Sequence, residues 1–396
     1  MPQPLAFVVP WYGARIPGGA ETECRKTAEQ LVRRGYPVEV LTTCGLQFHS
    51  DWAKNYHRPG LKHINGVPVR RFKVRPRNAR RFHRLNLRLM RGYPVSRDEE
   101  ADFMADMINS DDLCAFIAAQ RDAYHFVFIP YLYGTTFFGA QIAPERSFMI
   151  PCLHAEAYAG MTVWPPVMRA VRGLILHSAS ELRLAKALYD IPVSRLHLLG
   201  EGVDTVVSAN PQSFRATFGV AEAYIVYVGR RDETKNTPLL IEYFARYKAE
   251  HPGSLKLVLI GSGALSEAIR ARTDIVDAGQ VSDRVKNDAL AGAMCLCNPS
   301  LNESFSLALM ESWVVGRPAL VHAACAATAD HCRASHGGLY FENYAEFSAA
   351  VNWFLQNPMA AGTMGQQGRQ YVQANFGWDK IVKKIARLVY SDEAAP

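Results

Sequence analysis

The stretch LAFVVPWYGARIPGGAETECRKTAEQLVRRGYPVEVL, residues 5–41, decides the fold class. An apolar run at 5–9 is followed by a glycine-rich turn at 17–19, a helical pattern at 20–34 and a second apolar run at 38–41. A strand, a helix and another strand in this order are typical of a parallel sheet. The beginning of the chain therefore predicts an α/β domain.

A second series of the same kind begins near Ile225. The apolar runs YIVYVG, LKLVLIG, MCLCNPS and PALV alternate with helical patterns. Strands that are apolar throughout imply a sheet that helices cover on both faces. The predicted class is α/β, with two doubly wound Rossmann-like domains that face a central cleft.

The 396 residues exceed what one hydrophobic core usually organises. The segment SRLHLLGEGVDTVVSANPQS separates the two series, so we predict one domain at residues 1–196 and another at 197–376. The sequence WDKIVKKIARLVY has the period of an amphipathic helix. We therefore expect residues 377–396 to pack back toward the N-terminal domain.

The cysteine spacing and the apolar segments indicate the cellular compartment in which the protein is expected. The eight cysteines lack Cys-x-x-Cys spacing, which predicts reduced thiols in the cytoplasm and no metal site. The first residues lack the basic segment and long apolar run of a secretory signal. Residues 126–144 are uncharged, but prolines and glycines interrupt them. A buried strand, a loop and a helix are therefore expected there rather than a membrane span.

Two loops are candidates for anion binding. Gly18 and Gly19 stand where a strand passes into a helix, so a ligand can approach the backbone at a helix N-terminus, although a tight turn also explains them. Arg230 and Lys235 follow the strand YIVYVG. Cations at the carboxyl end of a strand can neutralise a diphosphate. Solvated loop charges are the alternative.

The sequence GSGALS, residues 261–266, comes close to the dinucleotide-binding fingerprint. It follows an apolar run, but serine stands where the fingerprint has its third glycine. A sharp turn in a Rossmann-like domain explains the two glycines without nicotinamide. An NAD-dependent oxidoreductase nevertheless stays as a rival function.

The sequence NESFSLALMES, residues 302–312, places Glu303 and Glu311 eight positions apart. On one helix they would be separated by about 12 Å. Glycosidases hold their two carboxyl groups about 5 to 9.5 Å apart. A hydrolytic pair is therefore disfavoured.

A helix N-terminus offers a better interpretation of the same segment. We predict that Ser304 is the N-cap, so that the amides of the next three residues face a phosphate. Glu311 would then accept hydrogen bonds from the hydroxyl groups of a ribose. Glu303 would reach hydroxyl groups on the other side of the phosphates.

Taken together, these motifs resemble the retaining glycosyltransferases of family 4, which have the GT-B fold. The resemblance runs nearly end to end and implies an acceptor-binding N-terminal domain and a nucleotide-sugar-binding C-terminal domain. It rests on PGGAETECRKTAEQLVRRGYPVEVLTT (17–43), EGVD (201–204), YVGRRDETKN (227–236), LVLIGSG (257–263) and the Glu-x7-Glu segment NPSLNESFSLALMESWVVGRPAL (298–320).

The resemblance implies roles for four charged residues. Arg230 and Lys235 would bind the diphosphate, Glu311 the ribose and Glu303 the hydroxyl groups of the donor sugar. The chain departs from the family by serine in place of a frequent glycine at position 306, and by Glu201 in place of a frequent asparagine.

Further donor contacts are implied in both halves of the chain. His154, in PCLHAEAY, stands where the family has a histidine near the transferred sugar, with a structural histidine as the alternative. Val281 falls where the family contacts the base. The opening glycines and the first amides of the Glu-x7-Glu helix complete the implied set: Gly18, Gly19, Phe305, Ser306 and Leu307.

The implied reaction is the retaining transfer of a hexose from a UDP- or GDP-linked sugar to a saccharide or glycolipid acceptor. Arg230, Lys235 and the helix N-terminus can offset the charge of the leaving diphosphate without a metal. The chain contains no Asp-x-Asp sequence, and no cofactor is expected besides the nucleotide sugar. The family implies attack on the face from which the diphosphate leaves, with Glu303 positioning the sugar. A non-catalytic sugar-nucleotide binder is a further alternative.

The positive charge lies in the first half of the chain. Residues 1–190 hold 25 Lys and Arg against 17 Asp and Glu, and residues 70–91 hold ten Lys or Arg with no acid. With its leucines and phenylalanines, this basic stretch can lie on an anionic membrane surface or bind an anionic acceptor. A solvated arm is the alternative. No nucleic-acid-binding motif accompanies the stretch, so nucleic acid is not expected as a partner.

Overall fold

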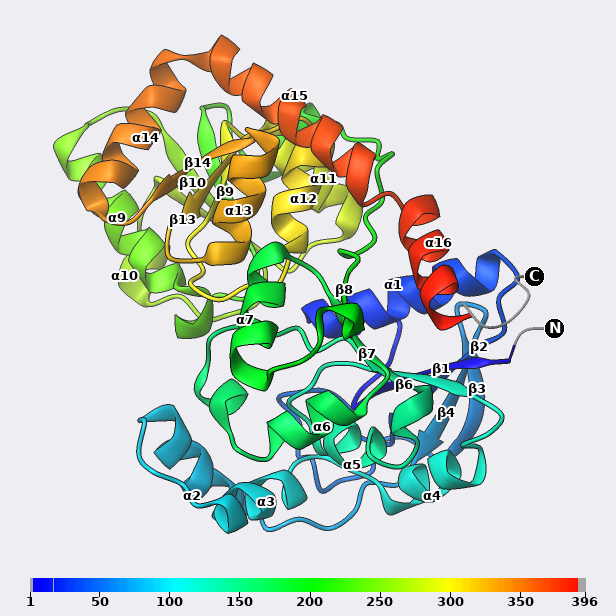
Figure 1. Ribbon diagram of the computed structural model, residues 1–396. Coiled ribbons are helices and arrows are strands. Elements are labelled where there is room, and N and C mark those ends of the chain that lie inside the picture. The colour runs from blue at the N-terminus through cyan, green and yellow to red at the C-terminus, as the bar shows by residue number, and fades with distance from the viewer. Residues whose placement is uncertain (1–2, 17, 391–396) are drawn as a thin grey trace. The chain divides into compact units, whose positions relative to one another are not determined.

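The computed structural model describes residues 3–16 and 18–390 (Figure 1). Pro17 of the predicted turn and residues 391–396 of the predicted C-terminal segment lie outside the described residues. The chain forms two compact units. Unit 1 is Met1–Gly202 with Trp378–Pro396, and unit 2 is Val203–Gly377. Each unit is described by itself.

The division between the units falls within EGVD rather than after residue 196. Residues 196–198 still form the last strand of the unit 1 sheet, so the segment that we predicted as interdomain begins inside unit 1. The second division falls after Gly377 rather than after residue 376.

Unit 1 is built on an eight-stranded sheet in the order β3-β4-β2-β1-β5-β6-β7-β8. Only β3 runs antiparallel to its neighbour, and the central strand β1 is fully buried. The strands are β1 Leu5–Val9, β2 Val38–Thr43, β3 Gly60–Ile64, β4 Val67–Phe72, β5 His125–Phe128, β6 Ser147–Met149, β7 Gly173–Leu176 and β8 Leu196–Leu198.

Helices flank this sheet on both sides (Figure 1). They begin where the sequence supplies caps: Ser96 forms a capping box at α3, and Ser178 accepts a bond from an amide of α7. The helix α16 contacts α1, and Arg34 pairs with Asp379 there at 2.6 Å. The helices are α1 Gly19–Arg33, α2 Ala79–Met90, α3 Arg97–Ala105, α4 Asp111–Ala119, α5 Gly134–Gly139, α6 Trp164–Ala170, α7 Ala179–Tyr189 and α16 Trp378–Val389.

Unit 2 is built on a six-stranded sheet in the order β11-β10-β9-β12-β13-β14. All of its strand pairs are parallel, which confirms the second α/β series. The strands are β9 Tyr224–Val228, β10 Lys256–Ile260, β11 Ile275–Gly279, β12 Cys295–Asn298, β13 Ala319–His322 and β14 Gly338–Phe341.

Except for the short α10, the helices of unit 2 bury residues against this sheet or against one another. Phe244 of α9 and Phe347 of α14 lie in the same core as the apolar residues of β9 and β10. The helices are α8 Pro211–Phe218, α9 Thr237–Glu250, α10 Glu267–Arg270, α11 Asp283–Gly292, α12 Leu307–Val314, α13 Ala326–Ser335, α14 Tyr344–Gln356 and α15 Pro358–Asn375.

The uncharged segment 126–144 forms β5, a loop and α5, as its prolines and glycines predicted. Within the described part of the chain, no helix is both long and apolar enough to cross a membrane. All eight cysteines fall in this part and are free thiols. The basic stretch 70–91 is not an unstructured arm, because it contains the end of β4 and all of α2.

Candidate functional site

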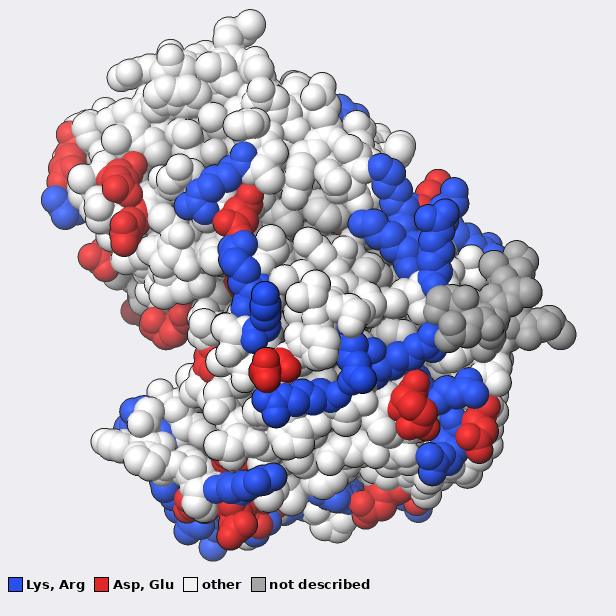
Figure 2. All heavy atoms as spheres, viewed as in Figure 1, with Lys and Arg blue, Asp and Glu red and all other residues white. Residues whose placement is uncertain are grey.

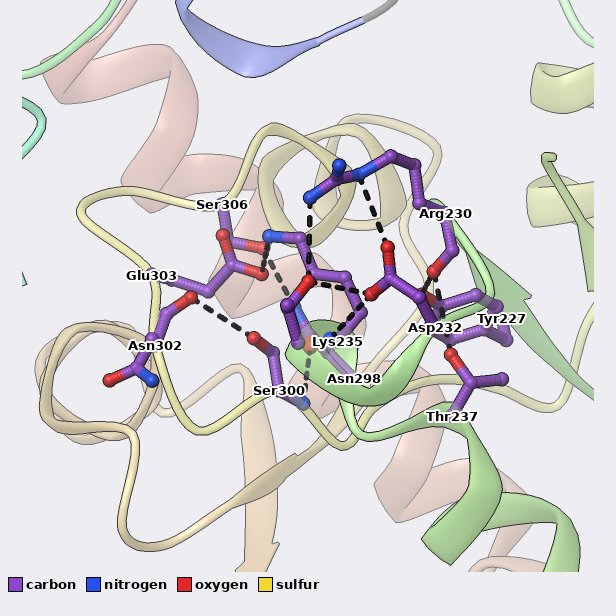
Figure 3. Close-up of polar contacts among 11 residues, drawn as sticks. Tyr227, Arg230, Asp232, Lys235, Thr237, Asn298, Ser300, Asn302, Glu303 and Ser306 are labelled. Atoms are coloured by element: carbon purple, nitrogen blue, oxygen red, sulfur yellow. Dashed lines mark hydrogen bonds and ion pairs between the residues drawn. The ribbon is translucent and has the colours of Figure 1, made fainter. Parts of the chain in front are cut away.

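The charged residues predicted in unit 2 gather at the carboxyl ends of two neighbouring strands, β9 and β12. Arg230 and Lys235 lie in the loop after β9, and Glu303 lies in the loop after β12 (Figure 3). Parallel strands that end at the same sheet edge bring the following loops together, and ligands of doubly wound sheets bind there. The topology therefore places three of the predicted side chains at one site.

Lys235 and Glu303 form the central ion pair of this site. Lys235 Nζ lies 2.7 Å from Glu303 Oε1, and both side chains are half-buried. The Asn236 side chain ties the two loops together, because its Nδ2 donates to the carbonyl of Pro299 at 3.1 Å. Asp232 caps the short turn that carries Lys235. The local fold thus holds a cation and a carboxylate face to face.

Arg230 is the loop arginine that stays accessible. Its Nε lies 3.6 Å from Asp232 Oδ2, and its side chain is more than one third exposed. Arg231 instead forms an ion pair with Asp277 at 2.5 Å, and its side chain is buried. Of the two arginines, Arg230 is the one that can reach a ligand.

The two glycines of the near-fingerprint have a structural role in the same place. Gly261 and Gly263 have φ values of 128° and 130°, and an added Cβ would lie 1.9 Å from the Gly229 carbonyl oxygen and 2.4 Å from that of Arg231. The following helix α10 is one short turn that begins only at Glu267. These glycines let the β10 loop pack on the arginine loop, which explains them without a dinucleotide.

The helix after β12 begins later than we predicted. Its N-cap is Ser306 and not Ser304, so α12 starts at Leu307. Ser306 has φ 77°, which takes it out of the helical region and excludes earlier residues from the helix. Its hydroxyl accepts a bond from Asn298 Nδ2 at 2.9 Å (Figure 3). A side chain of β12 therefore supports a conformation that glycine adopts more easily.

The first amides of α12 still suit an anion. The amides at the start of any helix lack intrahelical partners, and the helix dipole adds partial positive charge. Leu307 and Ser306 lie at this end of α12, whereas the Phe305 ring is buried against His331 and Phe376. Phe305 can therefore contribute its backbone to a ligand but not its ring.

Glu311 has a partner that the sequence did not indicate. Lys286 Nζ of α11 lies 2.7 Å from Glu311 Oε1 and 2.9 Å from Asp283 Oδ1. Burial disfavours the charge on Lys286, but the carboxylates of Glu311 and Asp283 outweigh burial and raise the pKa of its ammonium group. Helix α11 therefore brings Lys286 to Glu311, and Val281 lies in the loop just before the N-cap of this helix.

The remaining predicted residues belong to unit 1. Gly18 is the N-cap of α1 with φ 133°, and Gly19 is the first helical residue. Glycine is needed at position 18 because other residues rarely adopt such a φ. His154 is half-buried, with Nδ1 3.5 Å from Glu156 Oε2. Their roles toward a donor stay predictions.

Unit 1 also contains a buried charged group that the sequence analysis missed. His177 Nε2 lies 2.6 Å from Glu23 Oε1, and Glu181 accepts bonds from the amides of His177 and Leu153, each at 2.6 Å. Burial opposes the charged imidazolium, but the carboxylates of Glu23, Glu181 and Glu201 outweigh it and raise the pKa of His177 to about 10. His177 and Glu181 are four positions apart at the start of α7, but Glu23 comes from α1, so only the fold brings it to them.

The same group has side chains of the types that bind metals. Among the described residues, Glu23, Cys152 and His177 have ligand atoms within 4.8 Å of one another. Ligands of one tetrahedral zinc ion, each about 2.0 to 2.1 Å from it, are separated by about 3.3 Å. Glu23 and His177 are closer than that and bond to each other directly. The contacts are therefore those of a buried ion pair.

Comparisons with known proteins find similar sequences and similar folds. Residues 222–357 match the family described as "Glycosyl transferases group 1". An uncharacterized glycosyltransferase of Methanocaldococcus jannaschii is 22% identical over 97% of this chain and 97% of its own length. These matches cover the site residues of unit 2.

Solved structures share the fold of the whole chain. Sucrose-phosphate synthase from Thermosynechococcus elongatus has a TM-score of 0.73 at 18% identity and covers 98% of both chains. HepE of Anabaena, solved in complex with UDP and glucose, has a TM-score of 0.72 at 13% identity and covers 98% of this chain and 100% of its own. The two Rossmann-like sheets are those of GT-B structures. The chain therefore has the GT-B fold, and its residues 222–357 match the group 1 glycosyl transferase family.

Proposed function

We propose that the chain is a retaining family 4 glycosyltransferase. It moves a hexose from a UDP- or GDP-linked sugar to a saccharide or lipid-linked acceptor, without a metal and without a further cofactor. The UDP in the HepE complex supports a nucleotide donor of this class. The place of action that we propose is the cytoplasm, with attachment to the surface of a membrane.

The observation that carries the proposal is the ion pair of Lys235 and Glu303 beside the N-terminus of α12. The cation, the carboxylate and the first amides of α12 match two parts of a nucleotide-linked sugar, the diphosphate and the transferred sugar. The cation and the amides suit the diphosphate, and the carboxylate suits sugar hydroxyl groups. The second pair, Lys286 with Glu311, supplies a carboxylate for the ribose.

In the proposed reaction, the donor separates Lys235 from Glu303. Lys235 and Arg230 then bind the diphosphate, together with the amides of Ser306 and Leu307. As the bond between the sugar and the phosphate breaks, these groups stabilise the charge that develops on the leaving oxygen. Glu303 holds the hydroxyl groups of the sugar. The acceptor hydroxyl attacks the sugar carbon on the face that the diphosphate leaves, and its proton passes to the leaving phosphate oxygen.

For Gly18, Gly19 and His154 the proposal rests on the family resemblance, and for the two glycines also on their place at the N-terminus of α1. We propose that the glycines contact the donor through their backbone and that His154 bonds to the transferred sugar. Val281 is proposed to contact the base. The glycines lie at the N-terminus of α1, and His154 lies beside Glu156. These four residues are weaker candidates than the unit 2 pairs, because each of those pairs combines a cation with a carboxylate.

A panel of nucleotide sugars tests the proposal. The full chain is incubated with UDP-, GDP- and ADP-linked hexoses and saccharide or lipid-linked acceptors, and free nucleotide is measured. Turnover is expected with a UDP- or GDP-linked sugar, the product is expected to keep the anomeric configuration by NMR, and Glu303→Gln is expected to reduce turnover. Full turnover in Glu303→Gln would contradict the role of this residue.

The two rivals give different results in a thermal-shift experiment. Stabilisation by NAD but not by UDP or GDP would favour an oxidoreductase. Stabilisation by UDP or GDP without any release of nucleotide from the sugars would favour a non-catalytic binder. Addition of EDTA is expected to leave turnover unchanged, and a loss of turnover that Mg²⁺ restores would overturn the metal-independent part.

A further inference from the structure

The ten cations of residues 70–91 fall into two sets in the folded chain. Six of them contact other parts of unit 1. These are Arg70 with Glu39, Arg71 with the carbonyls of Tyr12 and Thr43, Arg75 with the carbonyl of Ala105, Arg77 against the rings of Trp52 and Phe82, Arg81 with Asp102 and Asp106, and Arg88 with Glu99. The other four are exposed: Lys73, Arg80, Arg84 and Arg91.

Helix α2 separates the two sets because its residues repeat every 3.6 positions. Phe82, Leu85 and Leu89 are buried against unit 1. Arg81 and Arg88 lie to one side of this buried face and pair with acids of α3 and its C-cap. Arg81 and Arg88 thus neutralise the acids of α3 and its C-cap that face α2.

The opposite face of α2 is basic and apolar at the same time. Arg80, Arg84, Leu87 and Arg91 are spaced by three or four residues, so they share one face. Leu87 is 50% exposed, and the adjoining Met90 and Tyr93 are 59% and 58% exposed. We name these six residues the α2 outer face. Figure 2 shows Lys and Arg side chains beside uncharged surface at the lower left, where Figure 1 places α2.

Large apolar side chains that stand in water beside cations usually mark a binding surface. A helix with cations and apolar groups on its accessible face suits the boundary between lipid headgroups and acyl chains. There the cations meet anionic headgroups, and the apolar side chains leave water. No acidic residue lies between residues 70 and 97 to oppose that approach.

We propose that the α2 outer face docks the protein on a membrane that contains anionic lipid. The inference deepens the proposed function, since it places a lipid-linked acceptor at a surface of unit 1, and it rests on that proposal only for this link. Nucleic acid is disfavoured, because phosphates along a backbone would attract the arginines but leave Leu87 and Met90 without a counterpart.

Vesicle flotation with the full chain tests the proposal. Vesicles of phosphatidylcholine are compared with vesicles that also contain phosphatidylglycerol, at low and high salt. The protein is expected to bind the anionic vesicles, and high salt is expected to weaken binding by screening. The variant Arg80→Glu/Arg84→Glu/Arg91→Glu is expected to bind at least about 100-fold more weakly, since the loss of each cation costs about fivefold and each new carboxylate repels the anionic lipid.

A matched variant makes the same change of charge at exposed cations away from α2. Arg270→Glu/Arg369→Glu/Lys383→Glu is expected to bind the anionic vesicles much as the unaltered protein does. Leu87→Ser/Met90→Ser keeps every cation and is expected to bind several-fold more weakly. Thermal unfolding and the release of nucleotide from a soluble donor monitor the fold and the active site of every variant.

Several results would overturn the proposal. Equal losses in the two triple variants would show that only net charge matters. Equal binding to neutral vesicles, or no binding to anionic ones, would remove the anionic membrane. Binding to a DNA duplex that depends on the three arginines but not on Leu87 or Met90 would assign the face to nucleic acid. Because vesicle binding is read without turnover, its failure is distinct from failure of the proposed transfer reaction.

Discussion

The two units hold their charged groups at different depths. In unit 1 the Glu23 and His177 side chains are 6% and 1% exposed and bond at 2.6 Å. In unit 2 the Lys235 and Glu303 side chains are 28% and 14% exposed and bond at 2.7 Å. The bond lengths are alike, so the difference between the two pairs is their access to water.

This difference separates a pair that stabilises the fold from a pair that can bind a ligand. Removing one partner of a buried pair leaves a charge without solvent and costs about 3 to 5 kcal/mol. A pair that reaches solvent contributes about 0 to 1 kcal/mol, so its partners separate easily. His177 therefore contributes to the stability of unit 1, whereas donor binding by Lys235 and Glu303 is part of the proposed function.

The largest effect is expected from His177→Asn. The variant leaves Glu23 and Glu181 buried without a cation, so the unfolding of unit 1 should become easier by about 3 to 5 kcal/mol at neutral pH. Urea denaturation followed by circular dichroism measures the loss. The double variant Glu23→Gln/His177→Asn removes a carboxylate as well and should recover part of it. If His177→Asn is as stable as the unaltered protein, the buried pair with Glu23 does not stabilise unit 1.

The next effect is on turnover in unit 2. Lys235→Ala should lower nucleotide release by about 100-fold, because a cation that stabilises the leaving diphosphate is lost. The midpoint of thermal unfolding should change little, because the pair with Glu303 is partly exposed.

The matched control for Lys235→Ala is an exposed ion pair in the same unit. Arg246 and Glu250 bond at 2.9 Å on α9, outside the site. Arg246→Ala should leave both turnover and the unfolding midpoint nearly unchanged. Equal turnover in the two alanine variants would remove Lys235 from the site.

The stability of unit 1 should also depend on pH, because the buried His177 changes its charge with pH. The pKa of His177 is raised from 6.5 to about 10 in the folded chain. Its contribution is therefore fully present below pH 6.5 and is lost as the pH rises toward 10. Between pH 7 and pH 9 the unaltered protein should lose about 2 kcal/mol of unfolding free energy more than His177→Asn does. Parallel urea curves for the two proteins at both pH values would contradict the raised pKa.

The smallest effect is expected at the start of α12. Asn298→Ala removes the bond that supports Ser306 at φ 77°, and a left-handed residue other than glycine costs about 1 kcal/mol or more. The KM for the donor should rise about fivefold, which corresponds to about 1 kcal/mol.

A double-mutant cycle isolates this support from the other bonds of Asn298. Glycine adopts the Ser306 conformation without help, so Ser306→Gly should leave the KM nearly unchanged. In the Ser306→Gly background, Asn298→Ala should raise the KM by a smaller factor. If the factor is the same in both backgrounds, Asn298 does not act through Ser306.

Much of unit 2 could be predicted from its sequence because its signals are local. The apolar runs predicted β9, β10, β12 and β13 and the parallel direction of these strands. The prediction of Ser304 as N-cap was wrong, because serine is a good cap at either position and only the φ of Ser306 decides between them. Lys286 could not be found, since it lies 25 residues from Glu311 and pairs with it only through the packing of α11 beside α12.

The basic stretch of unit 1 shows the opposite limit. Its composition predicted a cationic surface, yet six of the ten cations contact groups inside unit 1. Counting charges cannot distinguish Arg80, which is exposed, from Arg81, which pairs with Asp102 and Asp106. The packing of α2 beside α3 decides which arginines of α2 find an acidic partner. The structure reduces a run of 22 residues to one face of α2.

Three features could be established from local sequence: the two α/β series, the loops that carry Arg230, Lys235 and Glu303, and the resemblance to a glycosyltransferase family. These features depend on apolar periodicity and on residues close together in the chain. Only the tertiary structure decided which charges are paired and which of them reach water. That information lies in contacts such as Glu23 with His177 and Lys235 with Glu303, which join residues far apart in the chain. Burial then sets the strength of each contact, because a charge held away from water needs its partner far more than one at the surface.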